Sequence, residues 1–428
     1  MLKLILIYST STGLQRAIVF LASIALARSY PLAEVGQYIL TQTIAQLAIP
    51  LLTLNTTVAL ARESGQNPAR AGRLLGYVAG AAAAVFLLGT LVAWQFPSLR
   101  WSAMGVNLGA CEAMFVAAIA YLQGSERVGL IFKFSTVKTA LFAALLFLCY
   151  AKLVSIDGFI ALLSAVNFTL AALLVTLVAR GARRAARSDQ SDVSVKSMLK
   201  YSVATLPHTV ALWISVSSDR LILGALVGKE AVGRYSLSYT VAQAVMVIVS
   251  GVIAALPPRV ANDAPFWRVP ANVVAFVQKT AFACFAAVVM LLLFTALNNQ
   301  FLHVVPDTGP LSYFLIALIG SAFFFSIYYV LFASYLYLNR DTSALSKAGL
   351  LVGPLNIGLF FVLIHFFGPL GAAAGLVFSY LNFGIAYGYA ALRLEPGLKP
   401  VLRPLSLLSF AFVCAAVLLA SFMWTLDA

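Results

Sequence analysis

The sequence predicts an all-α polytopic membrane protein, with twelve core transmembrane helices in two pseudo-symmetric six-helix bundles and a thirteenth helix at the C-terminus. Composition, apolar runs and an internal repeat support this fold class. Hydrophobic residues make up 62% of the 428 residues, charged residues make up 10%, and the mean hydropathy is +0.96. A water-soluble globular protein of this size needs far more polar surface. The solvent of this chain is therefore lipid.

Apolar runs of membrane-spanning length occur thirteen times. A bilayer core about 30 Å thick is crossed by roughly 20 apolar residues in an α-helix. The predicted spans are Leu4–Ala27, Val35–Ala61, Leu74–Phe96, Ala103–Leu122, Leu130–Ala151, Ile156–Ala179, Val203–Leu226, Val232–Leu256, Val273–Leu297, Tyr313–Leu338, Ala348–Phe367, Leu370–Leu392 and Leu405–Leu426. The first is too long for a cleaved signal peptide and carries Arg16 in its middle.

The basic loop residues predict the orientation, because Lys and Arg accumulate in cytoplasmic loops. With a cytoplasmic N-terminus, eighteen basic residues fall in inner loops and four in outer loops. The four outer residues are Arg28, Arg100, Lys152 and Lys229. Topology therefore accounts for most of the net charge of +14 without a nucleic-acid partner.

An internal repeat relates the two halves at an offset of 197 residues. It aligns Val35–Gln46 with Val232–Gln243, and seven of these twelve positions are identical, including Tyr38 with Tyr235. Polar matches of this kind are not expected by chance between two apolar helices. The repeat unit is six helices, so both halves enter the membrane from the same side.

The repeat divides the chain into four predicted regions. These are an N-terminal six-helix bundle (residues 1–179), a basic cytoplasmic linker (180–200), a C-terminal six-helix bundle (201–392) and an additional C-terminal helix (393–428). The linker is the largest extramembrane segment, and it is too short for a soluble catalytic domain. The thirteenth span lies outside the repeat and is expected to be peripheral.

Two basic residues, Arg16 and Lys138, lie deep within predicted spans. A cation at that depth costs roughly 2.5–3.5 kcal/mol on insertion, so either a water-filled cavity or an anion must compensate it. One interpretation is a cationic cavity. The other is a structural ion pair with Glu112, the acid deep within the fourth span.

Other charges lie nearer the ends of spans. Lys133, Arg234 and Lys279 can extend to the headgroups or can line a cationic site.

In the seventh span, His208 and Asp219 share one helical face with Ser215, and Arg220 adjoins Asp219. They form either a structural ion pair or a protonatable, cation-binding site coupled to transport.

No chemistry-bearing motif indicates an enzyme. The four cysteines are isolated singles with no metal-binding spacing, and no P-loop or nucleophilic serine elbow is present. We therefore expect no metal and no cofactor. If transport uses energy, an ion gradient or the membrane potential would supply it.

Short stretches in both halves carry a family resemblance. They are Ser218-Asp219-Arg220-Leu221-Ile222-Leu223-Gly224 and Val232-Gly233-Arg234-Tyr235-Ser236 in the second half, and Leu26-Ala27-Arg28 and Val35-Gly36-Gln37-Tyr38 in the first. On these residues the chain resembles, over its whole length, the Wzx-type or O-antigen flippases of the multidrug/oligosaccharidyl-lipid/polysaccharide exporter superfamily. The thirteenth span departs from the twelve-helix pattern of these flippases.

The resemblance implies two V-arranged bundles around a central cationic cavity, and alternating-access transport of undecaprenyl-diphosphate-linked oligosaccharide from the cytoplasmic to the outer leaflet. The expected cationic set is Arg16, Lys133, Lys138, Arg220 and Lys279, because a diphosphate needs cations at membrane depth. Asp219, Glu112 and His208 are the candidates for ion coupling or a structural ion pair.

The same resemblance implies a place in lipopolysaccharide biosynthesis, in the bacterial inner membrane. The N-terminus is then cytoplasmic and the C-terminus periplasmic. The expected partners are the lipid-linked glycan, the bilayer, and polymerase and chain-length proteins of the pathway, with no nucleic acid.

Two other functions compete with the flippase. A multidrug or small-molecule exporter of the same superfamily would favour an acidic cavity. A membrane-embedded polymerase or glycosyltransferase would need a sizeable outward loop, whereas the longest here is Asn298–Ser312.

For the flippase, Arg16→Ala and Lys138→Ala are expected to leave the protein inserted but to abolish transport. Normal polysaccharide export in both single variants would contradict the cationic cavity.

Overall fold

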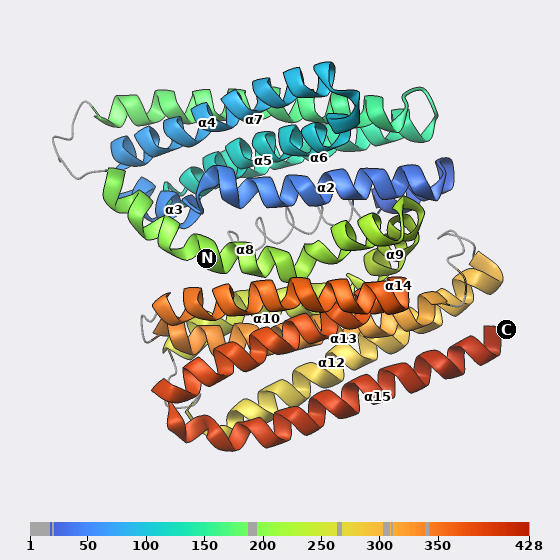
Figure 1. Ribbon diagram of the computed structural model, residues 1–428. Coiled ribbons are helices and arrows are strands. Elements are labelled where there is room, and N and C mark those ends of the chain that lie inside the picture. The colour runs from blue at the N-terminus through green and yellow to red at the C-terminus, as the bar shows by residue number, and fades with distance from the viewer. Residues whose placement is uncertain are drawn as a thin grey trace. The chain divides into compact units, whose positions relative to one another are not determined.

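The computed structural model describes residues 18, 21–186, 195–262, 268–302, 309, 311–338 and 342–427 (Figure 1). Within these residues the chain forms helices and contains no strand. The α-helices are α2 (Leu32–Thr53), α3 (Thr57–Gln66), α4 (Pro68–Gln95), α5 (Arg100–Gly124), α6 (Val128–Tyr150), α7 (Ile156–Ala186), α8 (Val195–Leu226), α9 (Lys229–Ala242), α10 (Val245–Asn262), α12 (Pro270–Leu297), α13 (Leu311–Leu338), α14 (Thr342–Leu394) and α15 (Leu402–Asp427). The predicted all-α polytopic fold class is confirmed.

The predicted spans agree with these helices in number and order. Nine helices of the described chain are long and apolar enough to cross a membrane, and two bent helix pairs raise the number to eleven. One of the nine, α14, contains both the eleventh and the twelfth predicted spans. They meet at Gly368, whose φ of 55° breaks the helix. Most of the first predicted span, Leu4–Ala27, lies outside the described residues.

The second predicted span is two helices, because the backbone turns between α2 and α3. Leu54 and Asn55 adopt left-handed conformations, with φ of 47° and 55°, and the helix axes diverge by 45°. Pro50 precedes the turn inside α2 and lacks a backbone N–H to continue the helix. The prediction of one continuous helix over Val35–Ala61 was wrong in this respect.

The eighth predicted span is also bent, between α9 and α10, by 57°. Here the turn falls at Gln243 and Ala244, where backbone bonds such as Met246 N–H to the Gln243 carbonyl (2.9 Å) tighten the helix to an i→i+3 pattern. Hydropathy did not reveal this bend, since no charged residue or proline marks it in the sequence.

The chain divides into two compact units, Met1–Thr209 (unit 1) and Val210–Ala428 (unit 2), and the division falls inside α8. Helix α8 begins at Val195, before the predicted span Val203–Leu226, so Pro207 lies within the helix. Residues 187–194 of the predicted linker lie outside the described chain. The predicted bundle boundaries at 179 and 201 stay a prediction.

Unit 1 is organised around α5, which packs against α2, α3, α4, α6 and α7. Small residues bring α2 close to it: a Cβ on Gly109 would lie 2.5 Å from that of Ala48, and one on Gly105 would lie 2.8 Å from the Thr41 carbonyl oxygen. Glycines four residues apart allow such close helix contact. The core around α5 is mainly alanine, leucine and methionine.

Unit 2 is organised in the same way around α13, which packs against α9, α10, α12, α14 and α15. In Figure 1, α12 and α15 run side by side. Phe412 of α15 stacks on Phe324 of α13 with ring centroids 4.5 Å apart, and the Tyr328 hydroxyl donates to the Leu405 carbonyl (3.3 Å). The thirteenth predicted helix is therefore packed into unit 2 and is not a loose addition.

Candidate functional site

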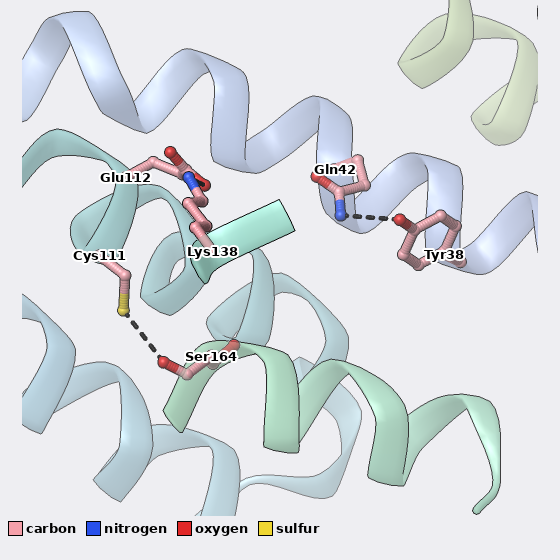
Figure 2. Close-up of polar contacts among 6 residues, drawn as sticks. All are labelled: Tyr38, Gln42, Cys111, Glu112, Lys138 and Ser164. Carbon is pink, nitrogen blue, oxygen red and sulfur yellow. Dashed lines mark hydrogen bonds and ion pairs between the residues drawn. The ribbon is translucent and has the colours of Figure 1, made fainter. Parts of the chain in front are cut away.

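One charged contact of unit 1 joins two neighbouring helices midway along their lengths. The Lys138 ammonium of α6 donates to Glu112 Oε1 of α5 at 2.5 Å (Figure 2). Lys138 lies midway along α6, and Glu112 lies midway along α5. Each helix is long enough to cross a bilayer, so the pair lies near the middle of both candidate spans.

An aromatic ring completes the surroundings of the lysine. The Lys138 ammonium lies 4.4 Å from the centroid of the buried Phe115 ring, within range of a cation–π interaction. The Lys138 side chain is 18% exposed and that of Glu112 is 25% exposed. The cation is therefore paired without being sealed from its surroundings.

Figure 2 also draws two neutral polar contacts on the helices of unit 1. On α2, Gln42 Nε2 donates to the Tyr38 hydroxyl at 3.1 Å. On the other side of α5, the Cys111 thiol donates to the Ser164 carbonyl of α7 at 3.4 Å. These contacts satisfy the neutral groups locally, so Glu112 supplies the negative charge that Lys138 meets.

The other predicted basic residues do not join this pair in the described structure. Arg16 lies outside the described residues. Lys133 is exposed on α6, and five residues correspond to a rotation of about 140° from Lys138 around the helix. Lys279 is exposed on α12, and Arg234 is exposed on α9 with Glu230 Oε1 at 3.3 Å. The roles predicted for Arg16, Lys133 and Lys279 stay predictions.

Asp219 and Arg220 lie in α8 within unit 2, and both are buried. Asp219 Oδ2 accepts from the Tyr235 hydroxyl of α9 at 2.6 Å, and its Oδ1 accepts from the Arg220 backbone N–H at 2.9 Å. The Arg220 guanidinium carbon lies 4.0 Å from the centroid of the Tyr239 ring. Each charged group therefore has partners from α8 and α9.

Two further residues of the predicted polar face of α8 are His208 and Ser215. His208 and Ser215 are buried, and Ser215 Oγ accepts from Asn356 Nδ2 at 2.7 Å. Asn356 Oδ1 in turn accepts from Asn382 Nδ2 at 2.8 Å. This chain of neutral groups joins α8 to both parts of α14.

Four residues of these sites were not singled out from the sequence: Phe115, Tyr239, Asn356 and Asn382. The asparagines carried a usable signal, because an amide in the middle of an apolar run requires a hydrogen-bond partner. The aromatic residues carried none, since such residues are frequent throughout these spans. Within the described residues, no group of three or more His, Cys, Asp or Glu could hold a metal ion.

Comparison with protein families finds one match in the first part of the chain. The family model described as "Polysaccharide biosynthesis protein" matches residues 1–262. No curated protein sequence matches the chain.

Three solved structures with a similar fold are described as a flippase or as transporters. Lipid II flippase MurJ, in an inward closed conformation, matches with a TM-score of 0.63 and 12% identity, covering 99% of this chain and 98% of that chain. An inward-facing multidrug resistance MATE family transporter of the MOP superfamily matches with a TM-score of 0.58 and 12% identity, covering 90% and 96%. The Vibrio cholerae MATE transporter VcmN in the bent form matches with a TM-score of 0.54 and 16% identity, covering 91% and 97%. At these identities the likeness establishes the fold.

Proposed function

The chain belongs to the polysaccharide biosynthesis protein family, and from this premise we propose that it is a flippase for lipid-linked oligosaccharide. Its substrate is an undecaprenyl-diphosphate-linked repeat unit of an O-antigen or exopolysaccharide. The chain carries it from the cytoplasmic to the outer leaflet by alternating access. The likeness in fold to a lipid II flippase supports a substrate of this kind, a lipid carrying a polar headgroup.

One observation carries the proposal: a lysine midway along a membrane-length helix, 18% exposed and held by one carboxylate and one aromatic face. A cation at that depth is costly, and such residues mark substrate or ion pathways in membrane proteins. Lysine binds phosphate as a compact point charge with three donors. Lys138 is therefore the residue that we assign to the diphosphate.

The family match favours this substrate over a cationic drug. Within the described part of unit 1, the acid placed midway along a span is Glu112, and its Oε1 already contacts Lys138. A cationic drug would have to compete with that lysine for the carboxylate. A diphosphate would in the same way have to compete with the carboxylate for the lysine, so the pair alone does not distinguish the two substrates.

The orientation follows from the loops. The excess of basic residues in alternate loops supports a cytoplasmic N-terminus and a periplasmic C-terminus. We propose a bacterial inner membrane as the location because the substrate is undecaprenyl-linked. Under this proposal the polymerase and chain-length proteins act on the product after it reaches the outer leaflet. The chain itself performs transport and makes or breaks no bond of the substrate.

Reconstitution tests the function. The purified full-length chain is placed in liposomes whose outer leaflet carries undecaprenyl-diphosphate-linked oligosaccharide, and a membrane-impermeant glycosidase reports the fraction still outside. We expect protected substrate to accumulate with the protein and not in protein-free liposomes. A cationic dye in parallel liposomes distinguishes the multidrug alternative. Movement of the dye without movement of the lipid-linked sugar would overturn the proposal.

A further inference from the structure

The Lys138–Glu112 contact is compatible with both a structural ion pair and a substrate site. The two roles are incompatible only if the ion pair never opens. A structural ion pair holds α5 to α6, whereas a substrate site needs a lysine that can accept another anion. We propose that Glu112 is an internal counter-anion, which occupies the phosphate position on Lys138 while the site is empty and is displaced by the substrate diphosphate. This inference rests on the proposed function and assigns a positioning and regulatory role to Glu112.

The geometry of the contact suits exchange. Glu112 reaches the ammonium through Oε1 alone, and both side chains are partly exposed. An ammonium has three donors and rotates freely, so another oxygen can replace the carboxylate without moving α6. Phe115 faces the same ammonium and can keep its contact during the exchange.

Another pair in unit 1 shows what a more enclosed ion pair looks like. Arg70 Nη1 of α4 lies 3.2 Å from Glu63 Oε2 of α3, and the Arg70 side chain is only 7% exposed. Arg70 lies in the first turn of α4, at a helix end and not at the centre of a span. A structural pair therefore exists in the same unit and provides a matched control.

The exchange of anions would keep the charge of Lys138 compensated in both forms of the carrier. An unpaired lysine midway along a membrane helix is energetically costly, so an empty carrier without Glu112 would be penalised at each return step. With Glu112, Lys138 meets an anion in both the loaded and the empty forms. The carboxylate also competes with the diphosphate, which lowers the apparent affinity and favours release.

Binding measurements on single variants test the competition. The purified full-length chain in lipid nanodiscs is titrated with geranylgeranyl diphosphate as the probe. Glu112→Gln removes the competing charge and is expected to tighten binding by on the order of tenfold, because a larger fraction of the sites is then free to bind. Lys138→Gln is expected to lose binding. Glu63→Gln, the control, is expected to bind as the parent does.

A double variant separates the proposal from a purely structural pair. Glu112→Gln combined with Lys138→Gln removes both charges, so neither is left without its partner, which is the main cost of breaking such a pair. A structural pair would be rescued by this change, so export would return. The counter-anion predicts a folded protein that neither binds the probe nor exports polysaccharide. The double variant decides the question even if Glu112→Gln alone does not stay folded.

Each result has a defined meaning. Tighter binding by Glu112→Gln, with Glu63→Gln unchanged, supports the counter-anion. Equal or weaker binding by folded Glu112→Gln, together with loss of binding in Lys138→Gln, overturns the counter-anion but leaves the proposed anion site intact. Parent-like binding by Lys138→Gln overturns both, as does export restored in the double variant.

Discussion

Units 1 and 2 both bury polar groups in the middle of long helices, but they satisfy these groups in different ways. In unit 1, the Lys138 and Glu112 side chains are partly exposed and joined by one contact. In unit 2, Asn356 is completely buried and bonded at both ends of its amide, to Ser215 and Asn382. One unit therefore holds an exchangeable charge, and the other holds a closed neutral network.

The difference indicates how one repeated scaffold can carry two roles. Replacing the partner of Lys138 requires the loss of one contact, which an incoming anion can remake. Displacing Asn356 requires two hydrogen bonds to be lost together, one buried and one partly buried, and an unmade bond of a buried polar group is costly. We therefore assign substrate binding to unit 1 and mechanical integrity to the network of unit 2.

The buried charges of unit 2 support the same division. Asp219 is completely buried, and both of its carboxylate oxygens accept hydrogen bonds, from Tyr235 and from the Arg220 backbone. A carboxylate enclosed in this way holds α9 against α8. It offers no accessible charge to a substrate, in contrast to Glu112.

The largest effect on transport is expected from Lys138→Ala in unit 1. A hydrogen bond to a charged group is worth about 1.5–3 kcal/mol, so losing it should lower export by about 100-fold while the protein stays inserted. Surface polysaccharide in a strain lacking its own copy measures this. Arg234→Ala, which removes an exposed arginine of unit 2, is the control and should export normally. Normal export by Lys138→Ala would contradict the assignment of substrate binding to unit 1.

The largest effect on stability is expected from Asp219→Ala in unit 2. It leaves Arg220 buried without its neighbouring carboxylate and Tyr235 without its acceptor, which should lower the free energy of unfolding by about 3–5 kcal/mol. Thermal unfolding of the purified chain in detergent measures the change.

Asp157→Ala is the matched control, because its pair with Arg100 is largely exposed and should matter by less than about 0.5 kcal/mol. Equal melting temperatures for the two variants would show that the buried carboxylate is not structural.

A smaller loss of stability is expected from Asn356→Ala. Removing the amide leaves Ser215 and Asn382 without their buried partner, at about 1–3 kcal/mol. Export per folded molecule should nevertheless stay near that of the parent, because the network does not contact the substrate in this account. Asn382→Ala, at a partly exposed position, should cost less. Loss of export in folded Asn356→Ala would contradict the assignment of a purely structural role to this network of unit 2.

The smallest effect is expected from Glu230→Ala on the surface of α9. Its contact with Arg234 is an exposed i,i+4 ion pair, worth about 0.3–0.5 kcal/mol. Melting temperature and export should both be nearly unchanged. A large loss in either would mean that charge at the surface of unit 2 has a role like that of Lys138.

Much of the fold follows from hydropathy, because a lipid solvent dictates long apolar helices separated by polar loops. The break at Gly368 was anticipated by the gap between the predicted spans ending at Phe367 and starting at Leu370. The bends at Leu54–Asn55 and Gln243–Ala244 were not, because backbone turns inside apolar sequence leave hydropathy unchanged. Although the repeat aligns the two second spans, their bends fall at different positions.

The candidate site was predicted less completely. Depth within the spans identified Lys138 and Glu112, and their pairing was one of two interpretations. The partners of Asp219 and Ser215 could not be predicted, since Tyr235 and Asn356 come from other helices and contacts of this kind are set by packing. The asparagines Asn356 and Asn382 carry no charge, so charge alone does not identify them, although buried amides need hydrogen-bond partners as buried ions do.

Side-by-side reconstitution of Lys138→Met and Asn356→Ala tests the central claim most directly. Both variants are purified, corrected for the folded fraction and assayed in the same liposomes for translocation of undecaprenyl-diphosphate-linked oligosaccharide. The account predicts that Lys138→Met loses translocation while Asn356→Ala retains a rate close to that of the parent. The reverse order, with activity kept by Lys138→Met and lost by Asn356→Ala, would contradict it.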